Sequence, residues 1–254
     1  MVTVADTAFS IAAVRAAEAA RPAAERLFED PYASLFAAGG AHAAEATQRY
    51  LALPFFHDGV RLRTRFLDDA VRAAIAAGLE RLVLLGAGFD TRGLRMPEIR
   101  AGGVAVFEVD FPAQLERKRA LLAAGGVSLP AHVAHVACDF AAPDFDLDLE
   151  ASLAEAGFRR GAGAIFVWEG VVGYIDAAMI DRSLALMARV GGPGTRVAFT
   201  FASASFAPYT ALERVRRAGF TTCEDCSGED LWRRWLAGEP HPAACMMRVG
   251  LATV

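Results

Sequence analysis

The spacing of apolar residues changes near residue 80. Before that point, apolar positions recur at helical intervals, most clearly in the stretches 12–20 and 57–77. Pro22 and the Asp30-Pro31 pair are typical of new helix starts. We therefore predict a helical N-terminal cap over residues 1–78 and no strand within it.

Beyond residue 80, short apolar runs alternate with stretches of helical spacing. The runs do not alternate apolar with polar residues, which is typical of strands buried on both faces of a parallel sheet. We predict strands at 82–85, 104–109, 133–138, 164–168, 197–201 and 245–253. We predict helices at 112–124, 176–190, 209–218 and 229–236. Residues 79–254 are thus expected to form a doubly wound α/β domain, in one compact unit with the cap.

Composition narrows the possible partners. The chain has 254 residues, of which 54% are hydrophobic, and a formal net charge of −4. No stretch is strongly basic, so nucleic acid is not an expected partner. No apolar run approaches the roughly 20 residues that span a bilayer, so we expect a soluble, cytoplasmic protein with no membrane partner.

The cysteines do not predict a metal site. Cys223 and Cys226 have metal-like spacing, but no second pair and no suitably spaced histidines accompany them. We expect no bound metal.

The residues that follow the predicted strands carry the candidate chemistry. They are Gly86, Asp110, Asp139 and Glu169. In open α/β sheets, ligands bind outside the carboxyl ends of the strands. We therefore expect a glycine turn and these carboxylates to surround one ligand.

The glycine turn Gly86-Ala87-Gly88 favours one ligand class over another. Missing side chains let the backbone approach a ligand closely, although a tight strand-to-helix turn explains two glycines equally well. A dinucleotide fingerprint would have a third glycine at position 91, where the chain has Thr91. Phe89 and Asp90 add bulk and negative charge where phosphates would lie. A cationic sulfonium ligand tolerates both features better.

Each carboxylate has a ligand role and a structural alternative. Asp110 follows Gly88 by roughly 20 residues, a spacing typical of an acid that binds ribose hydroxyls; the alternative is a helix N-cap before Pro112. Asp139 could meet an adenine amino group or simply cap a turn. Glu169 could meet a methionine ammonium or the acceptor, or be a buried structural carboxylate.

Taken together, several segments resemble the leucine carboxyl methyltransferase family, in particular its bacterial branch of secondary-metabolism enzymes. They are Arg15-Ala-Ala-Glu18, Leu27-Phe28-Glu-Asp30-Pro31, Arg63-Thr64-Arg65-Phe66-Leu67-Asp68-Asp69, Leu85 to Arg92, Phe107-Glu-Val-Asp110-Phe-Pro112 and Trp168-Glu169-Gly-Val-Val-Gly-Tyr174-Ile. The resemblance implies a class I methyltransferase fold, with a mostly parallel seven-stranded sheet and a helical N-terminal cap. It also implies S-adenosylmethionine as cofactor and S-adenosylhomocysteine as product.

The resemblance further implies roles for single residues. Arg65 would pair with the methionine carboxylate, and Glu169 would lie near the ammonium. Asp110 would bind the ribose and Tyr174 would lie on the acceptor side. The glycine turn and the strand ends complete the expected cofactor site, whose members are Arg65, Gly86, Gly88, Asp110, Asp139, Phe140 and Glu169.

The expected activity is O-methylation of a small metabolite, at a carboxyl or a hydroxyl group. A carboxylate acceptor needs no general base, whereas a hydroxyl acceptor benefits from one. Tyr174 and His57 are the candidate catalytic residues. Two alternatives remain: an NAD(P)-dependent oxidoreductase on a similar fold, and a catalytically inactive methyltransferase-like binding protein. The oligomeric state stays open.

Overall fold

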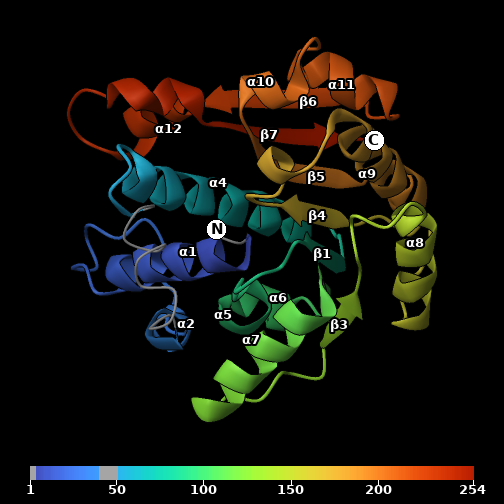
Figure 1. The fold of residues 1–254 in the computed structure, drawn as a ribbon, viewed down its shortest axis with the longest axis horizontal. Helices are drawn as coiled ribbons and strands as arrows, with labels where there is room; N and C mark the ends of the chain where they lie inside the picture. Colours follow the sequence, from blue (N-terminus) through green and yellow to red (C-terminus); the bar gives the residue numbers. More distant parts are fainter. Residues whose placement is uncertain (1–3, 40–50) are drawn as a thin grey trace.

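A seven-stranded sheet forms the centre of the computed structural model, which describes residues 4–39 and 51–254 (Figure 1). The strand order is β3-β2-β1-β4-β5-β7-β6. The first five strands are parallel: β1 (Arg81–Leu85), β2 (Ala105–Asp110), β3 (Val133–Ala137), β4 (Ile165–Trp168) and β5 (Arg196–Phe201). The last two, β6 (Thr222–Ser227) and β7 (Arg248–Thr253), pair antiparallel at one end.

The predicted α/β fold is confirmed, and one strand is new. The five apolar runs form the five parallel strands, and the C-terminal stretch forms β7. The strand β6 is not predicted from the sequence, because its residues Thr-Cys-Glu-Asp-Cys-Ser are mostly polar. As an edge strand, β6 leaves most of these side chains partly or fully exposed, so its sequence carries no apolar signal.

Helices cover both faces of the sheet. Successive residues of β1 point to opposite faces, so Val83 and Leu85 belong to one apolar core while Leu82 and Leu84 belong to the other. The first core includes α8 (Phe145–Glu155), α9 (Ala177–Gly191) and α11 (Ala211–Arg217). The second includes α4 (Phe56–Ala76), α6 (Pro97–Ala101) and α12 (Gly228–Trp235). The shorter elements are α5 (Arg92–Arg95), α10 (Ser203–Phe206), η2 (Val172–Tyr174) and η3 (Pro242–Met246).

The N-terminal cap consists of helices and a turn segment. The helices are α1 (Val4–Ala19) and α2 (Ala33–Gly39), followed by α4. The predicted helix start at Pro22 is wrong, because residues 20–32 form turns and bends. The buried carboxylate of Glu18 holds this segment by accepting the Leu27 backbone N–H at 2.7 Å. Any helix in residues 40–50 lies outside the described residues.

A third, smaller apolar cluster joins the cap to the sheet domain. It brings together Phe9 and Ala12 of α1, Phe36 of α2 and Phe89 of the glycine turn, with Leu94 and Leu122. Leu122 belongs to α7 (Pro112–Ala124). The Phe36 and Phe89 rings stack with centroids 4.6 Å apart. These contacts hold α1 over the loops that follow the parallel strands, and α1 also packs beside α4 (Figure 1).

Across residues 4–39 and 51–254, every helix is too short or too polar to cross a membrane.

Candidate functional site

A cavity of about 350 Å³ lies at the carboxyl ends of β1, β2 and β4, with α1 as its cover. This is where the strand order reverses, since β4 returns to the other side of β1. Ligands of open α/β sheets bind at such switch points, and the volume suits a small molecule. The predicted site residues in its wall are Gly86, Gly88, Asp110, Phe140, Glu169 and Tyr174.

The glycine turn packs tightly against the loop after β4. Gly86 has a φ of 68°, and a Cβ there would lie 2.4 Å from Cγ2 of Val171. Gly88 has a φ of 48°, in the left-handed region that favours glycine. The turn therefore presents bare backbone to the cavity.

Thr91, at the position of the absent third glycine, has a structural role. Its side chain is fully buried, and its hydroxyl donates to Oδ2 of Asp30 at 2.7 Å. This bond fixes the turn segment of the cap to the loop after β1, so position 91 is not part of a phosphate cradle.

Asp110 joins the end of β2 to the glycine turn. Its Oδ2 accepts the Gly88 N–H at 2.6 Å, and its Oδ1 accepts the Phe111 N–H at 2.7 Å. Burial raises the pKa of Asp110, and these two N–H donors oppose the rise. The N-cap alternative is wrong, because Phe111 is the N-cap of α7 and no side chain caps that helix. Each carboxylate oxygen keeps a further lone pair for a ligand.

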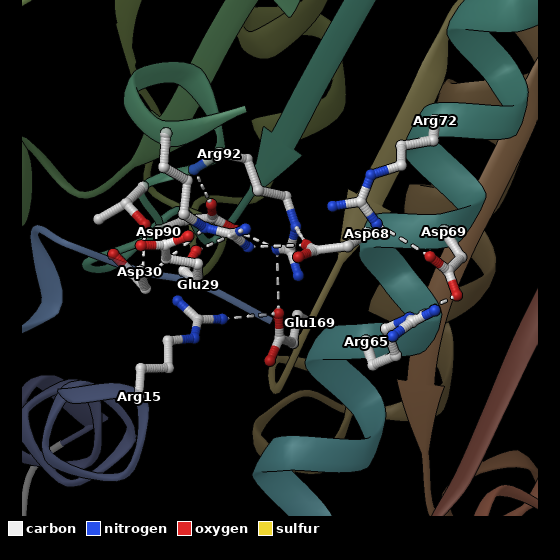
Figure 2. A network of polar contacts seen from close by, with 12 residues as sticks. Arg15, Glu29, Asp30, Arg65, Asp68, Asp69, Arg72, Asp90, Arg92 and Glu169 are labelled. Atoms are coloured by element: carbon white, nitrogen blue, oxygen red, sulfur yellow. Dashed lines mark hydrogen bonds and ion pairs between the residues drawn. The ribbon is translucent and has the colours of Figure 1, made fainter. Parts of the chain in front are cut away.

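Glu169 is the centre of a buried network of charges (Figure 2). Its carboxylate accepts from Arg15 at 3.0 Å, from Arg63 at 2.9 Å and from Arg92 at 3.1 Å. Burial alone would raise the pKa of Glu169, but the three guanidinium groups outweigh burial and hold the pKa well below its ordinary value. Glu169 is therefore an anion at neutral pH.

Arg92 connects this network to two further carboxylates. Its Nε donates to Asp68 at 2.8 Å, and its Nη1 donates to Asp90. Asp68 also accepts from Arg95 at 2.7 Å. The charge of Asp90 is thus paired with Arg92 inside the protein. Repulsion of phosphates by Asp90, as predicted from the sequence, is therefore a weaker argument against a dinucleotide.

Among the described residues, each of the three arginines that bond Glu169 has a buried guanidinium nitrogen without a partner: Nε of Arg15, Nη2 of Arg63 and Nη2 of Arg92. Arg92 lies outside the cavity wall. Arg15 lines the cavity, and Nη2 of Arg63 lies 3.6 Å from where a Cβ of Gly170, another wall residue, would be. An unpaired buried donor costs about 1–3 kcal/mol, more if charged, so a ligand carboxylate would be favoured here. With Glu169 available to an ammonium, this end of the cavity fits a zwitterionic amino-acid group.

The structure places Arg65 outside the cavity wall, and its predicted pairing with a ligand carboxylate is not supported (Figure 2). Its Nε donates to Asp69 at 2.8 Å, its Nη1 donates to the Leu27 carbonyl, and its guanidinium stacks on Trp235. Residues two apart on a helix point about 200° apart, so only one of Arg63 and Arg65 can face the site. Arg63 also lies outside the cavity wall, but its guanidinium points to the site and bonds Glu169, which is a wall residue.

Two other predicted residues also lie outside the cavity wall. Asp139 is exposed and accepts the Ala141 N–H at 2.9 Å, which matches its alternative as a turn residue. His57 is exposed in the first turn of α4. Tyr174 does line the cavity, with 50% of its surface exposed.

Lys118 is the single lysine of the chain, and the sequence pattern predicts no role for it. It is fully buried on α7, where its ammonium donates to Glu108 of β2 at 2.7 Å and to the backbone carbonyl of Asp90. It thereby ties the helix, the strand and the glycine turn together.

Comparisons with known proteins show the family and the fold of the chain. A family model described as leucine carboxyl methyltransferase matches residues 8–188. A Streptomyces coelicolor protein named as an S-adenosyl-L-methionine-dependent methyltransferase is 33% identical over 250 residues, covering 94% of this chain and 83% of its own length. A Parafrankia protein of the same description is 36% identical over 200 residues, covering 76% of this chain and 61% of its own length.

Among solved structures, a protein from Thermobifida fusca described as a methyltransferase superposes with a TM-score of 0.61. The alignment covers 99% of this chain and 94% of the other at 16% identity. At that identity the match concerns the fold.

Proposed function

The chain belongs to the leucine carboxyl methyltransferase family of S-adenosylmethionine-dependent enzymes, and we propose that it methylates a carboxylate oxygen of a small molecule. When bound, S-adenosylmethionine supplies an electrophilic methyl group on its sulfonium. The protein then contributes alignment of the two reactants and exclusion of water.

The residues of the cavity wall, with Arg63 behind Glu169, divide between the two ends of the cofactor. Glu169 would hold the ammonium of the methionine part, while Arg15 and Arg63 would hold its carboxylate with their unpaired N–H groups. Asp110 would accept hydrogen bonds from the ribose hydroxyls. Phe140 would pack against the adenine.

The observation that favours a carboxylate over a hydroxyl acceptor is the lack of a free base. The described part of the cavity wall contains no histidine. Of its carboxylates, Asp90 is paired with Arg92, and Asp110 and Glu169 would be used by the ribose and the ammonium of the cofactor. A carboxylate is anionic at neutral pH and attacks without losing a proton, whereas an alcohol or phenol gains from a base.

The cover formed by α1 favours a small acceptor. Thr7, Ala8 and Ile11 lie across the glycine turn, and the large exposed side chains of the wall are those of Tyr174 and Phe111. We propose that the acceptor enters on the Tyr174 side, and that the partner is a small metabolite rather than a nucleic acid or a membrane.

Methyl esters and methyl ethers differ in stability, and this difference tests the proposal. The protein is incubated with methyl-tritiated S-adenosylmethionine and panels of small carboxylic acids and phenols. The expected product releases volatile tritiated methanol in mild base, as esters do. Label that resists base and follows the phenol panel would contradict carboxyl methylation while leaving the enzyme class intact.

Thermal shift separates this enzyme from an oxidoreductase or an inactive relative. S-adenosylhomocysteine should raise the melting temperature, because a ligand that binds only the folded state stabilises it, and NADH should not. A shift with NADH alone would contradict the cofactor assignment. Cofactor binding without methyl transfer to any member of both panels would favour the inactive alternative.

A further inference from the structure

Gln114 is a polar side chain of the cavity wall to which the proposed cofactor contacts assign no role. Gln114 lies in the first turn of α7 and lines the cavity, with 8% of its surface exposed. Among the described residues, neither Oε1 nor Nε2 of this amide has a hydrogen-bond partner. Leaving buried polar groups unpaired is unfavourable, so a ligand that pairs with them gains affinity.

The position of Gln114 indicates which part of the ligand it meets. Its backbone N–H donates to the carbonyl of Phe111, so the helix begins directly after Asp110 and brings the two side chains to the same end of β2. Four residues further on, on the same face of α7, Lys118 bonds to the Asp90 carbonyl. This face of the helix therefore looks onto the glycine turn and the carboxylate of Asp110.

We propose that Gln114 is a second ribose-binding residue, which hydrogen-bonds the 2′,3′-diol of the cofactor beside Asp110. The inference rests on the proposed cofactor site. Asp110 can only accept hydrogen bonds when ionised, so it can satisfy the hydroxyl protons but not the oxygen lone pairs. The Gln114 amide supplies the missing donor at Nε2, and its Oε1 accepts a further hydroxyl proton. Together the two residues accept hydrogen bonds from the diol protons and donate one to a diol oxygen.

The proposal predicts a coupling between one side chain and one part of the ligand. We measure by calorimetry the affinity of the full-length protein for S-adenosylhomocysteine and for its 2′-deoxy and 3′-deoxy analogues, without any turnover. The same titrations are run on Gln114→Leu, which keeps the volume and removes the polar atoms. Glu116→Ala, an exposed position on the same helix, is the matched control.

Gln114→Leu should bind S-adenosylhomocysteine about three- to tenfold more weakly, as expected for the loss of one or two neutral hydrogen bonds. At least one deoxy analogue should then lose clearly less affinity in Gln114→Leu than in the wild type, because its missing hydroxyl no longer has this partner. Glu116→Ala should match the wild type with every ligand. If Gln114→Leu fails to fold, Gln114→Asn, whose amide is one methylene short of the diol, should show the same pattern.

Two results would overturn the inference alone. One is wild-type affinity for S-adenosylhomocysteine in the Gln114 variants. The other is that removing the 2′- or the 3′-hydroxyl of the ligand lowers the affinity by the same factor in wild type and variant. If the variant instead changes the difference in affinity between S-adenosylhomocysteine and S-inosylhomocysteine, Gln114 would be assigned to the base. Failure of the wild-type protein to bind S-adenosylhomocysteine would overturn the cofactor site itself, and with it this inference.

Discussion

Arg63 and Arg65 lie two residues apart on α4 and have different surroundings. The Arg63 guanidinium reaches Glu169 and keeps one buried N–H without a partner among the described residues. Arg65 is part of a surface cluster with Asp69 and Trp235. At the scale of single residues, orientation on the helix decides which of two identical side chains can act on a ligand.

Substituting each arginine by methionine tests this difference. Arg63→Met should weaken binding of S-adenosylhomocysteine about tenfold to a hundredfold, since hydrogen bonds to charged groups contribute about 1.5–3 kcal/mol. Arg65→Met should change the affinity by less than about threefold, because exposed ion pairs contribute little. Calorimetric titration of both variants gives the comparison, and the reverse order would return the role to Arg65.

Glu169 makes the stability of the protein depend on pH, and the lowered pKa of its carboxyl gives the direction of this dependence. Its pKa is lower in the folded state than the ordinary value of 4.5, so its contribution to stability is complete above that pH and is lost as the pH falls towards the folded-state pKa. Glu169→Gln should lower the free energy of unfolding at neutral pH by about 3–5 kcal/mol, as expected when one partner of a buried ion pair is removed.

Urea unfolding of wild type and Glu169→Gln, between neutral pH and about pH 3, measures both effects. The wild type should lose stability below about pH 4.5 more steeply than the variant. Parallel curves for the two proteins would show that Glu169 does not carry the acid dependence.

At the scale of elements, α1 forms the wall of the cavity opposite the sheet. Thr7, Ala8, Ile11, Ala12 and Arg15 line the cavity, and their spacing places them on one side of a helix. The alanine-rich sequence of α1 is therefore informative: small side chains at positions 8 and 12 leave room for a ligand between the helix and the glycine turn.

Enlarging one of these alanines should close that room. Ala8 has its Cβ 3.7 Å from where a Cβ of Gly88 would be. Ala8→Trp should weaken binding of S-adenosylhomocysteine at least about tenfold, because the indole occupies ligand volume, while Ala17→Trp on the exposed side of α1 should bind as the wild type does. Equal affinities in the two tryptophan variants would contradict the placement of α1 over the ligand.

Whether an element can be predicted from the sequence depends on where its side chains lie in the fold. The five parallel strands are apolar because both their faces are covered, and their order in the chain indicated the fold. The edge strand β6 and the turns after Pro22 gave no such signal. The side chains of β6 are mostly exposed, and the turn segment is held by a hydrogen bond from the Leu27 backbone to the Glu18 side chain.

The strand-end residues Gly86, Asp110 and Glu169 could be placed in the site from topology alone. The partners of Glu169 could not, since they come from α1, α4 and α5 and depend on helix orientation.

At the scale of the whole molecule, the cap and the sheet domain share one core. Leu62, Phe66, Leu67 and Val71 of α4 are buried against Leu82 and other residues of the sheet. Losing buried side chains of this size costs about 2–5 kcal/mol each, and four of them reach the total stability of an ordinary domain, about 5–15 kcal/mol. We therefore propose that residue 78 marks a change of architecture and not a boundary between independent folding units.

Two fragments test this shared core. The fragment 79–254, which lacks α4, should be unfolded or molten by near-ultraviolet circular dichroism. The fragment 51–254 keeps α4 and should unfold cooperatively, at a lower melting temperature than the full chain and without binding S-adenosylhomocysteine. A cooperative transition for 79–254 would show that the sheet domain folds without the cap.

Because Lys118 is buried, the rate at which a reagent modifies its amine reports how often this part of the protein opens. An acylating reagent reacts with an uncharged, solvent-accessible amine, and this ammonium is enclosed between Glu108 and the glycine turn. Acylation at Lys118 therefore requires the segment around Asp90 to separate from α7, and mass spectrometry can follow its rate in the unmodified chain. Saturation with S-adenosylhomocysteine should slow that rate, because the ligand stabilises the closed segment. The only lysine of the chain thus turns an ordinary labelling reaction into a measure of how often the cofactor site opens.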